Sequence, residues 1–173
     1  MQKLILFILL LSTVSCSSTV SNKNPLGKVF PSIQGTSLVS KKVNIPEDFK
    51  GKMTLLLLGY KMDAQFDIDR WLLGLTQLKV SIPIYELPTI KGMIPRLISS
   101  KIDQGMRDGI PKEDWVSVIT IYKDSEKVIN FTGNEKPLNG RVALIDENGK
   151  VVYFHDRGYS AKHLLELVKL IKQ

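Results

Sequence analysis

Cysteine is almost absent from this sequence, because the 173 residues contain only one, Cys16. A single cysteine cannot form an internal disulfide, a Cys-X-X-Cys redox pair or a cysteine zinc cluster. Histidine is nearly as scarce: only His155 and His163 occur, and no patterned carboxylates accompany them. We therefore expect no metal site, and we interpret both histidines as surface or capping residues.

Motifs that would indicate a cofactor or a known catalytic class are also missing. The chain has no phosphate-binding glycine loop, no dinucleotide fingerprint and no supported Ser-His-Asp order. Its formal net charge is +7, but the lysines are scattered and form no run of five or six. We therefore expect no cofactor and no nucleic-acid partner, although some lysines remain candidates for a membrane-facing role. The composition, 43% hydrophobic and 24% charged, is typical of one globular domain.

The N-terminus has the layout of an export signal. Lys3 precedes an unbroken apolar run over residues 4–11, and small residues follow as far as Cys16. A membrane-spanning helix needs roughly 20 apolar residues, so this run is much too short to be one. The pattern therefore indicates a secretory signal peptide over residues 1–15.

The residues around the cysteine resemble a bacterial lipobox, in which a small residue precedes an invariant cysteine. Val14 and Ser15 fit this pattern, whereas Thr13 stands where leucine is usual. The resemblance implies that Cys16 is acylated and anchors the protein to the inner or outer membrane, facing the periplasm or the exterior. The alternative is an ordinary secretory signal with an incidental cysteine. Residues 16–26 then form the lipidated cysteine and a polar, flexible tether, and residues 27–173 form the folded domain.

The domain alternates buried strands with amphipathic helices. Residues 53–58 form a continuous apolar run, which is typical of a strand buried on both faces. Residues 64–79 carry an apolar stripe at helical spacing, with Asp63 as the expected N-cap. The same reasoning predicts an N-terminal arm with a small hairpin over 27–46, strands at 82–87, 116–122, 142–145 and 150–154, and helices over 90–107, 124–130 and 161–172.

The order β-α-β-α-β-α-β-β-α favours a central mixed sheet with helices on both faces. It is the thioredoxin topology with an N-terminal extension and an inserted helix. Phe30-Pro31, Gly35 and Leu38 look like the opening of a peroxiredoxin-like domain, and residues 143–150 (ALIDENGK) look like that superfamily's penultimate hairpin. The chain thus resembles the thioredoxin and peroxiredoxin superfamily, which implies an α/β, thioredoxin-like fold but no particular reaction.

More closely, the chain is similar to the mitochondrial assembly factor family for the membrane part of ATP synthase, which shares this fold. Those factors are membrane-associated helpers rather than known enzymes, so the resemblance implies an assembly role. An exported lipoprotein, however, faces away from the compartment where bacterial ATP synthase is completed. The similar stretches are residues 51–58, Trp71, 85–88, 105–107, 110–111, 141–149, Gly158, 160–161 and the last helix.

In this superfamily the redox site follows the first buried strand, at a helix N-terminus that lowers a thiol pKa. That place here is residues 59–65 (GYKMDAQ), which contain no Cys, Ser or Thr. The superfamily's cis-proline is also missing from the residues next to Arg141. Thiol exchange and peroxide reduction therefore have no visible nucleophile. We expect Arg141 to lie beside Tyr60 and Lys61, where it forms a salt bridge or binds an anion or peptide carboxylate.

Three functions remain open. The first is a non-catalytic binding or assembly module, anchored in the cell envelope, whose cleft at Tyr60, Lys61, Asp63 and Arg141 holds a peptide or membrane-protein client. The second is an enzyme that uses Tyr60, Asp63 and Arg141 in place of cysteine, which predicts a sealed pocket with converging polar groups. The third is a purely structural surface lipoprotein.

Overall fold

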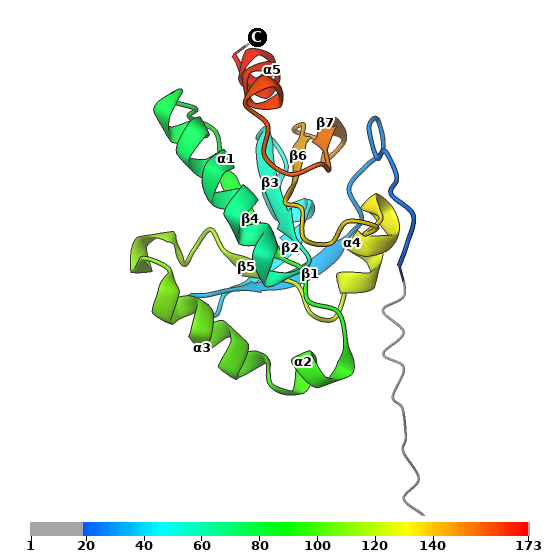
Figure 1. The fold of residues 1–173 in the computed structure, drawn as a ribbon, viewed down its shortest axis with the longest axis vertical. Coiled ribbons are helices and arrows are strands. Elements are labelled where there is room, and N and C mark those ends of the chain that lie inside the picture. The colour runs from blue at the N-terminus through cyan, green and yellow to red at the C-terminus, as the bar shows by residue number, and fades with distance from the viewer. Residues whose placement is uncertain (1–18, 173) are drawn as a thin grey trace, which may run out of the picture.

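The computed structural model of the protein describes residues 19–172 (Figure 1). The signal peptide predicted over residues 1–15 and the lipidation predicted at Cys16 lie outside the described residues. Within 19–172, no helix is both long enough and apolar enough to cross a membrane.

Four strands form the central sheet: β3 (Thr54–Gly59), β4 (Ile84–Pro88), β6 (Arg141–Ile145) and β7 (Val151–His155). Their order is β4-β3-β6-β7. β3 and β4 run parallel, whereas β6 is antiparallel to both of its neighbours, β3 and β7. Every residue of β3 is buried, as its continuous apolar run predicts for a central strand. The central sheet is therefore mixed, as expected.

Three further strands extend this sheet: β1 (Ile33–Ser37), β2 (Lys42–Ile45) and β5 (Ile119–Thr120). They pair antiparallel in the order β2-β1-β5. Parallel bridges join Glu86 to Val118 and Thr89 to Ile121, so the chain around β5 lies alongside β4. The hairpin predicted in the N-terminal arm is confirmed. The strand predicted over residues 116–122 is shorter than expected, with only two residues in β5.

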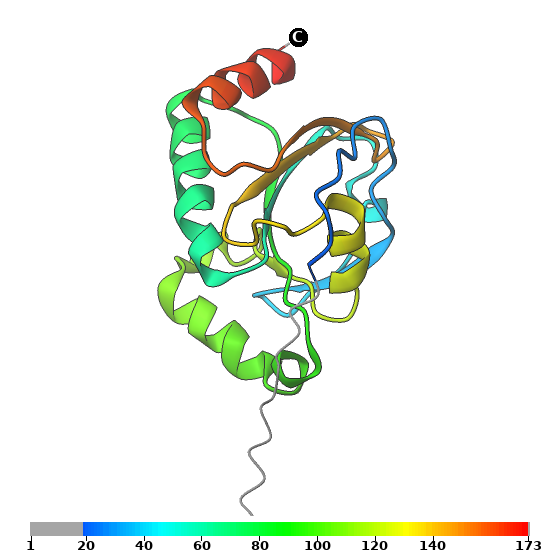
Figure 2. The ribbon, with the colours of Figure 1, turned by 45° about the vertical axis from the view of Figure 1, so that its right-hand side comes forward.

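Helices cover both faces of the central sheet: α1 (Gln65–Gln77), α4 (Ser125–Thr132) and α5 (Ala161–Ile171). α1 and α5 lie on one face, and α4 lies on the other (Figure 2). Leu55 and Leu57 of β3 pack with the residues of α1 and α5, whereas Leu56 and Leu58 pack with those of α4. The alternation of side chains along β3 thus produces two hydrophobic cores. The predicted architecture, a mixed sheet between helices, is confirmed.

The single helix predicted over residues 90–107 is wrong, because the chain forms two helices, α2 (Met93–Leu97) and α3 (Ser99–Gly109). Pro95 opposes a helix that starts at 90, since its ring would clash with the carbonyl group four residues earlier. Ile98, with φ −108° and ψ 20°, separates the two helices. No residue of α2 or α3 is buried, so the apolar face predicted for this segment does not enter a core.

The start of α1 also differs from the prediction. Asp63 does not cap the helix, because it lies in a preceding 3-10 turn and Ala64 is the N-cap, without a side-chain hydrogen bond. Asp67, inside the first turn, has the larger role. Its carboxylate accepts hydrogen bonds from the backbone N–H of Gly140 (3.0 Å) and of Tyr159 (3.0 Å). It thereby connects α1 to the loops that precede β6 and α5.

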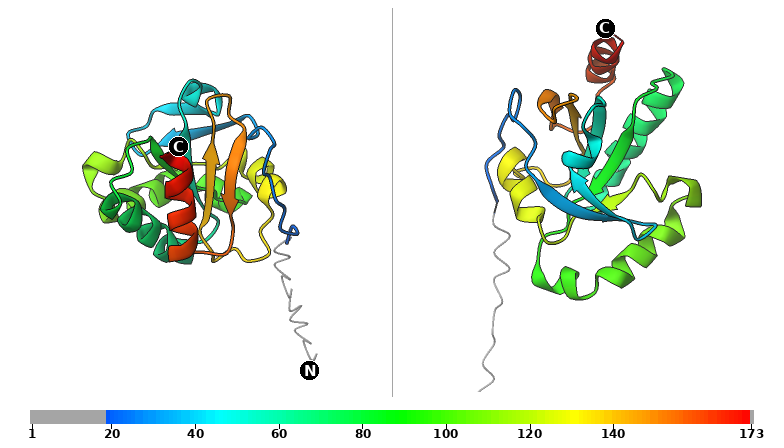
Figure 3. Two further views of the ribbon diagram at one scale, coloured as in Figure 1. Left: turned by 90° about the horizontal axis from the view of Figure 1, so that it is seen from above. Right: turned by 180° about the vertical axis from the view of Figure 1, so that it is seen from behind.

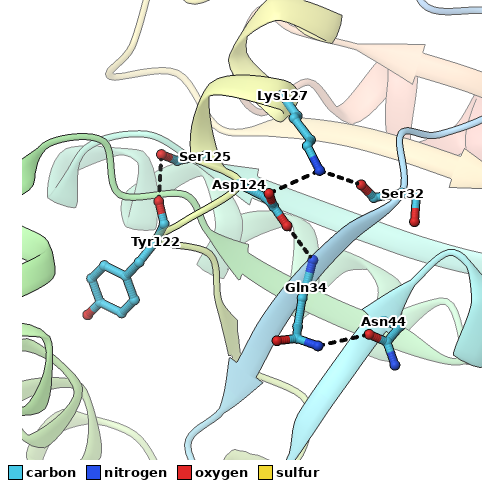
Figure 4. A network of polar contacts seen from close by, with 7 residues as sticks. All are labelled: Ser32, Gln34, Asn44, Tyr122, Asp124, Ser125 and Lys127. Carbon is cyan, nitrogen blue, oxygen red and sulfur yellow. Dashed lines mark hydrogen bonds and ion pairs between the residues drawn. The ribbon is translucent and has the colours of Figure 1, made fainter.

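A polar network joins the N-terminal hairpin to the start of α4 (Figure 4). The Asp124 carboxylate accepts a hydrogen bond from the backbone N–H of Gln34 (2.9 Å) and lies 3.1 Å from Lys127 Nζ. Lys127 in turn donates to the carbonyl oxygen of Ser32 (3.2 Å), and the Gln34 amide donates to Asn44 Oδ1 (3.1 Å). These contacts connect the hairpin to the start of α4.

Residues 20–24 precede the hairpin and are held against the domain; this short segment is called the arm from here on. The backbone N–H of Val20 donates to Asn134 Oδ1 (2.6 Å), and the N–H of Asn134 donates to the Val20 carbonyl (2.8 Å). The N–H of Lys23 donates to the Thr132 carbonyl (3.0 Å). This part of the segment does not match the flexible tether predicted over 16–26. The tether stays a prediction for residues 16–18, which lie outside the described residues.

Candidate functional site

The loop between β3 and α1 follows the first central strand, where the superfamily resemblance puts the redox residues. Tyr60 and Lys61 leave β3, and the turn Met62–Ala64 leads into α1. β4 ends beside β3, since Pro88 is paired with Gly59 and the N–H of Thr89 donates to the Gly59 carbonyl (2.8 Å). The candidate site therefore lies at the carboxyl end of two parallel strands, a common place for ligand sites in α/β sheets.

Tyr60 fills this place with a neutral phenol. Its side chain is 9% exposed, and its hydroxyl is hydrogen-bonded to Thr132 Oγ1 of α4. Burial raises the pKa of Tyr60 to about 12, against the opposing effects of the Thr132 hydrogen bond and the Arg141 charge. At neutral pH the group is protonated, so it supplies neither a nucleophile nor a general base there.

Arg141, the first residue of β6, lies beside Tyr60 as the sequence predicts. Its guanidinium carbon is 4.6 Å from the centroid of the Tyr60 ring, a cation–π distance. Nη1 donates to the Asn139 carbonyl (3.1 Å) and Nη2 donates to Asn22 Oδ1 (3.5 Å), whereas Nε has no partner among the described residues. The residue is 0% exposed, and burial lowers its pKa.

The salt bridge expected of Arg141 is not formed within residues 19–172, because none of the ion pairs there includes it. The guanidinium is held by neutral oxygens and an aromatic face. The Asp156 carboxylate acts on Arg141 at longer range and opposes the lowering of its pKa, but without an ion pair the buried cation recovers only part of the hydration free energy that it loses. The site therefore favours an anionic group, provided that one can reach the guanidinium.

Lys61 and Asp63 are not drawn into this cluster. Both side chains are exposed, and neither forms a hydrogen bond or ion pair with Tyr60 or Arg141. The structure thus brings Tyr60 and Arg141 together but leaves Lys61 and Asp63 on the adjoining surface turn. The enzyme hypothesis needs Asp63 to converge with Tyr60 and Arg141, and this arrangement does not do so.

Two residues that sequence reasoning did not select complete the cluster. Thr132 bonds the Tyr60 hydroxyl, and Asn22 of the arm accepts hydrogen bonds from Arg141 and from the backbone N–H of Glu135 (3.1 Å). Asn22 therefore contributes to the cover over the guanidinium. No local pattern marks Asn22, because its partner Arg141 is 119 positions away in the chain.

The two histidines form a pair rather than separate surface or capping residues. The rings of His155 and His163 lie 4.1 Å apart, and His155 is only 8% exposed, which corrects the sequence interpretation. Burial lowers the pKa of His155, and the nearby His163 adds to the effect. Glu166 contacts His163 (2.9 Å), but nowhere in residues 19–172 do three His, Cys, Asp or Glu side chains gather as metal ligands would.

A shallow hollow adjoins both the arm and the histidine pair. Its lining includes Asn22 and His155, but neither Tyr60 nor Arg141. A second hollow lies between β2 and β4 and is lined by residues such as Val43, Phe49 and Tyr85. It too includes neither Tyr60 nor Arg141. Neither hollow is the sealed pocket with converging polar groups that the enzyme hypothesis predicts.

Glu86 is a further buried charge-bearing group on the side of β4 near α1. It is 8% exposed, and its carboxylate lies 3.4 Å from the Gln65 side-chain nitrogen. Burial raises the pKa of Glu86 from 4.5 to about 7, with an opposing effect from the Gln65 hydrogen bond and a further rise from Asp69. Sequence reasoning missed it, because its burial depends on the parallel pairing of β4 with the chain at Val118.

No protein-family model matches the sequence, and no curated protein matches it. Several solved structures, however, are similar to this chain in fold. The thioredoxin domain of a thiol-disulfide oxidoreductase from Bacteroides vulgatus is 20% identical, with a TM-score of 0.58 over 87% of this chain and 100% of that one. BsSco, a member of the Sco family of cytochrome c oxidase assembly proteins, is 14% identical, with a TM-score of 0.62 over 88% and 96%. A SCO1/SenC family lipoprotein from Bacillus anthracis is 15% identical, with a TM-score of 0.60 over 88% and 98%. The chain therefore has a thioredoxin-like fold.

Proposed function

We propose that this protein is an exported lipoprotein, held to a membrane through Cys16, whose thioredoxin-like domain binds an envelope protein without redox chemistry. One observation carries the proposal. Tyr60 occupies the redox position and is bonded to Thr132 and stacked on Arg141, whereas the only cysteine of the chain is at position 16. The scaffold of the superfamily is retained while its reactive sulfur is missing.

The binding role rests on Arg141. Its buried positive charge forms no ion pair among the described residues and interacts with Asp156 only at longer range, and the Asn22 amide oxygen is a weak substitute at 3.5 Å. A carboxylate from a client peptide would form a charge-assisted, bidentate contact in its place. Asn22 would have to move off the guanidinium for this to happen, while Val20 can stay bonded to Asn134. Val20 itself packs against the core on the α4 side, but Asn22 and Lys23 are held only by polar contacts to residues 130–135 and to Arg141, so moving these two residues opens neither hydrophobic core.

An assembly role in the envelope agrees with two likenesses. The sequence resembles the assembly factors for the membrane part of ATP synthase, and one structural neighbour is named as a cytochrome c oxidase assembly protein. Another neighbour is named as a lipoprotein, in agreement with the lipobox at Cys16. For this chain we infer a client that is an envelope protein, most simply one embedded in the same membrane.

Site-specific photo-cross-linking tests the binding role. A photoreactive amino acid is placed at Lys61, on the exposed turn of the site, or at Lys162, on the exposed surface of α5, and cells are irradiated before the membranes are isolated. We expect a discrete adduct from position 61 that is absent from position 162. Arg141→Gln should abolish the adduct, while Arg141→Lys, which keeps the charge, should retain part of it. No adduct, or the same adduct from both positions, would contradict the proposal.

Two companion measurements test the anchor and the chemistry. Fractionation after lipid labelling should place the natural chain in the membrane with label, whereas Cys16→Ser should carry none. Disulfide exchange and peroxide reduction by the purified protein should not exceed the uncatalysed rates in either form. Turnover that survives Cys16→Ser would point to a reaction at another residue and would refute the binding-module assignment.

A further inference from the structure

Three apolar side chains of α2 are among the most exposed in the described part of the chain. Met93, Ile94 and Leu97 are 77%, 73% and 79% exposed. No side chain of α2 is hydrogen-bonded to the rest of the described chain, whereas α3 is fixed through Arg107 Nε to the Leu38 carbonyl (2.8 Å) and through Asp103 to the Tyr122 hydroxyl (2.8 Å). α2 therefore presents an apolar surface to the exterior that the fold does not use.

The sequence of α2 and its flanks carries only basic charge, and one acidic residue of α4, Glu126, lies 3.6 Å from Lys91. Residues 90–102 contain Lys91, Arg96 and Lys101 but no Asp or Glu. Exposed apolar residues between basic ones are the composition of helices that lie in the headgroup region of a bilayer. Each lysine or arginine near an anionic surface contributes about 1 kcal/mol of attraction.

A second apolar pair lies at the same end of the sheet. Met62 and Phe66 are 90% and 69% exposed, and their spacing puts them on one side of the start of α1. This start follows β3, and α2 follows β4 after a short loop, so both are at the carboxyl ends of the two parallel strands. α2 and the start of α1 share one end of the molecule, and α5 lies at the other, both in Figure 1 and from behind in Figure 3.

The anchor would hold this end toward the membrane. Val20 is fixed to Asn134, next to Thr132, whose side chain bonds Tyr60 just beyond the end of β3. Only four residue steps separate Cys16 from Val20, a reach of at most about 14 Å. A domain of this length is roughly 40 Å across. Because this reach is much shorter than the domain, an acylated Cys16 keeps the carboxyl end of β3 near the headgroups. The opposite end of the domain cannot face the membrane at the same time.

We propose that α2, with Met62 and Phe66, rests in the headgroup region of an anionic bilayer and fixes the orientation of the domain on the membrane. The inference rests on the proposed acylation of Cys16. It makes the lipid anchor and α2 two joint attachment points, of which the acyl chains supply the membrane affinity and α2 supplies the orientation. In this orientation the Tyr60–Arg141 site lies close to the surface of the bilayer, within reach of clients embedded there.

Single-cysteine labelling provides the test, because an acylated Cys16 does not react with a thiol probe. Ile94→Cys and Leu165→Cys replace side chains that are 73% and 59% exposed, on α2 and on the distant α5. Each full-length variant is labelled with an environment-sensitive fluorophore and reconstituted into phosphatidylglycerol vesicles that contain a lipid-borne quencher. We expect severalfold stronger quenching at 94 than at 165, with a blue-shifted emission at 94 only.

The charge contribution is tested in the same system. Replacing phosphatidylglycerol with phosphatidylcholine, or changing Lys91, Arg96 and Lys101 together to Gln, should reduce the quenching at 94. Met93→Ser with Leu97→Ser should do the same, and Leu73→Ser, at a 60% exposed site on α1, should not. Equal quenching at 94 and 165 overturns the inference. A probe at 94 with blue-shifted emission that the lipid quencher does not reach also overturns it, because this combination indicates that a protein partner covers α2.

The outcomes separate the inference from the function on which it rests. If the natural chain itself takes up the probe, Cys16 is not acylated and the proposed anchor is wrong. The two labelled positions are then compared on a Cys16→Ser background, where preferential quenching at 94 still supports membrane contact by α2 and equal quenching still refutes it. If Cys16 is blocked and position 94 behaves like 165, the anchor stands and only the orientation is wrong.

Discussion

Glu86→Gln should stabilise the protein at neutral pH, and the structure gives the size of the effect. Burial raises the pKa of Glu86 from 4.5 to about 7. At about 1.36 kcal/mol per pKa unit, the ionised form of the folded protein is penalised by roughly 3 kcal/mol relative to the unfolded chain. Glutamine has nearly the same shape and carries no charge, and it can keep a hydrogen bond to Gln65. This substitution therefore removes the penalty without opening a cavity.

The sign of the pH dependence follows from the direction of the shift. A carboxyl group with a raised pKa in the folded state binds its proton more tightly there, so its stabilising contribution is complete below pH 4.5. That contribution is lost as the pH rises to about 7. The free energy of unfolding of Glu86→Gln should therefore match that of the natural chain at pH 4 and exceed it by about 2 to 3 kcal/mol at pH 8.

Urea unfolding at the two pH values measures this difference directly. The fluorescence of Trp71, which is fully buried beside the central sheet, reports on the folded state. Glu113→Gln, at an exposed position, is the matched control and should change stability little at either pH. A gain of the same size at pH 4 and pH 8, or no gain at pH 8, would refute the claim that desolvation of Glu86 is responsible.

Three other substitutions test the contacts of α4 and its two ends with the segments around it. Tyr60→Phe keeps the ring against Arg141 but removes the hydroxyl bonded to Thr132, and should lower the free energy of unfolding by about 1 kcal/mol in urea titrations. Asp124→Asn should cost about 1 kcal/mol at pH 7. Burial opposes the lowering of the Asp124 pKa, but hydrogen bonds from Gln34 and Lys127 prevail, so this difference is lost as the pH falls below the folded pKa. Gly133→Ala would put a Cβ 2.3 Å from the Ser21 carbonyl at a φ of 76°, and should speed hydrogen exchange in residues 20–24.

Local patterns in the sequence predicted most of the fold. The apolar run at 53–58 became β3, and the hairpin over 142–154 formed around its Asp-Glu-Asn-Gly turn. Ser160 caps α5 as expected, with its Oγ accepting from the N–H of His163 (3.4 Å). Such features depend on neighbours a few residues away, and their physical causes can therefore be recognised in a single sequence.

What the sequence did not reveal depends on contacts between distant segments. The burial of His155 against His163 and the hydrogen bond from Arg141 to Asn22 exist only once the sheet is assembled. The apolar residues of α2 misled for a different reason. Apolar residues that face a core and apolar residues that stay at the surface can have the same spacing, so periodicity alone could not show that Ile94 and Leu97 stay outside the fold.

Intact mass spectrometry of the protein isolated from membranes tests the central claim most directly. If the domain is held to the bilayer through its only sulfhydryl and works without a thiol, the mature chain should begin at Cys16 and carry the mass of a diacylglyceryl group with additional acyl chains. A chain that retains residues 1–15, or one that begins elsewhere with an unmodified, reactive Cys16, would contradict it.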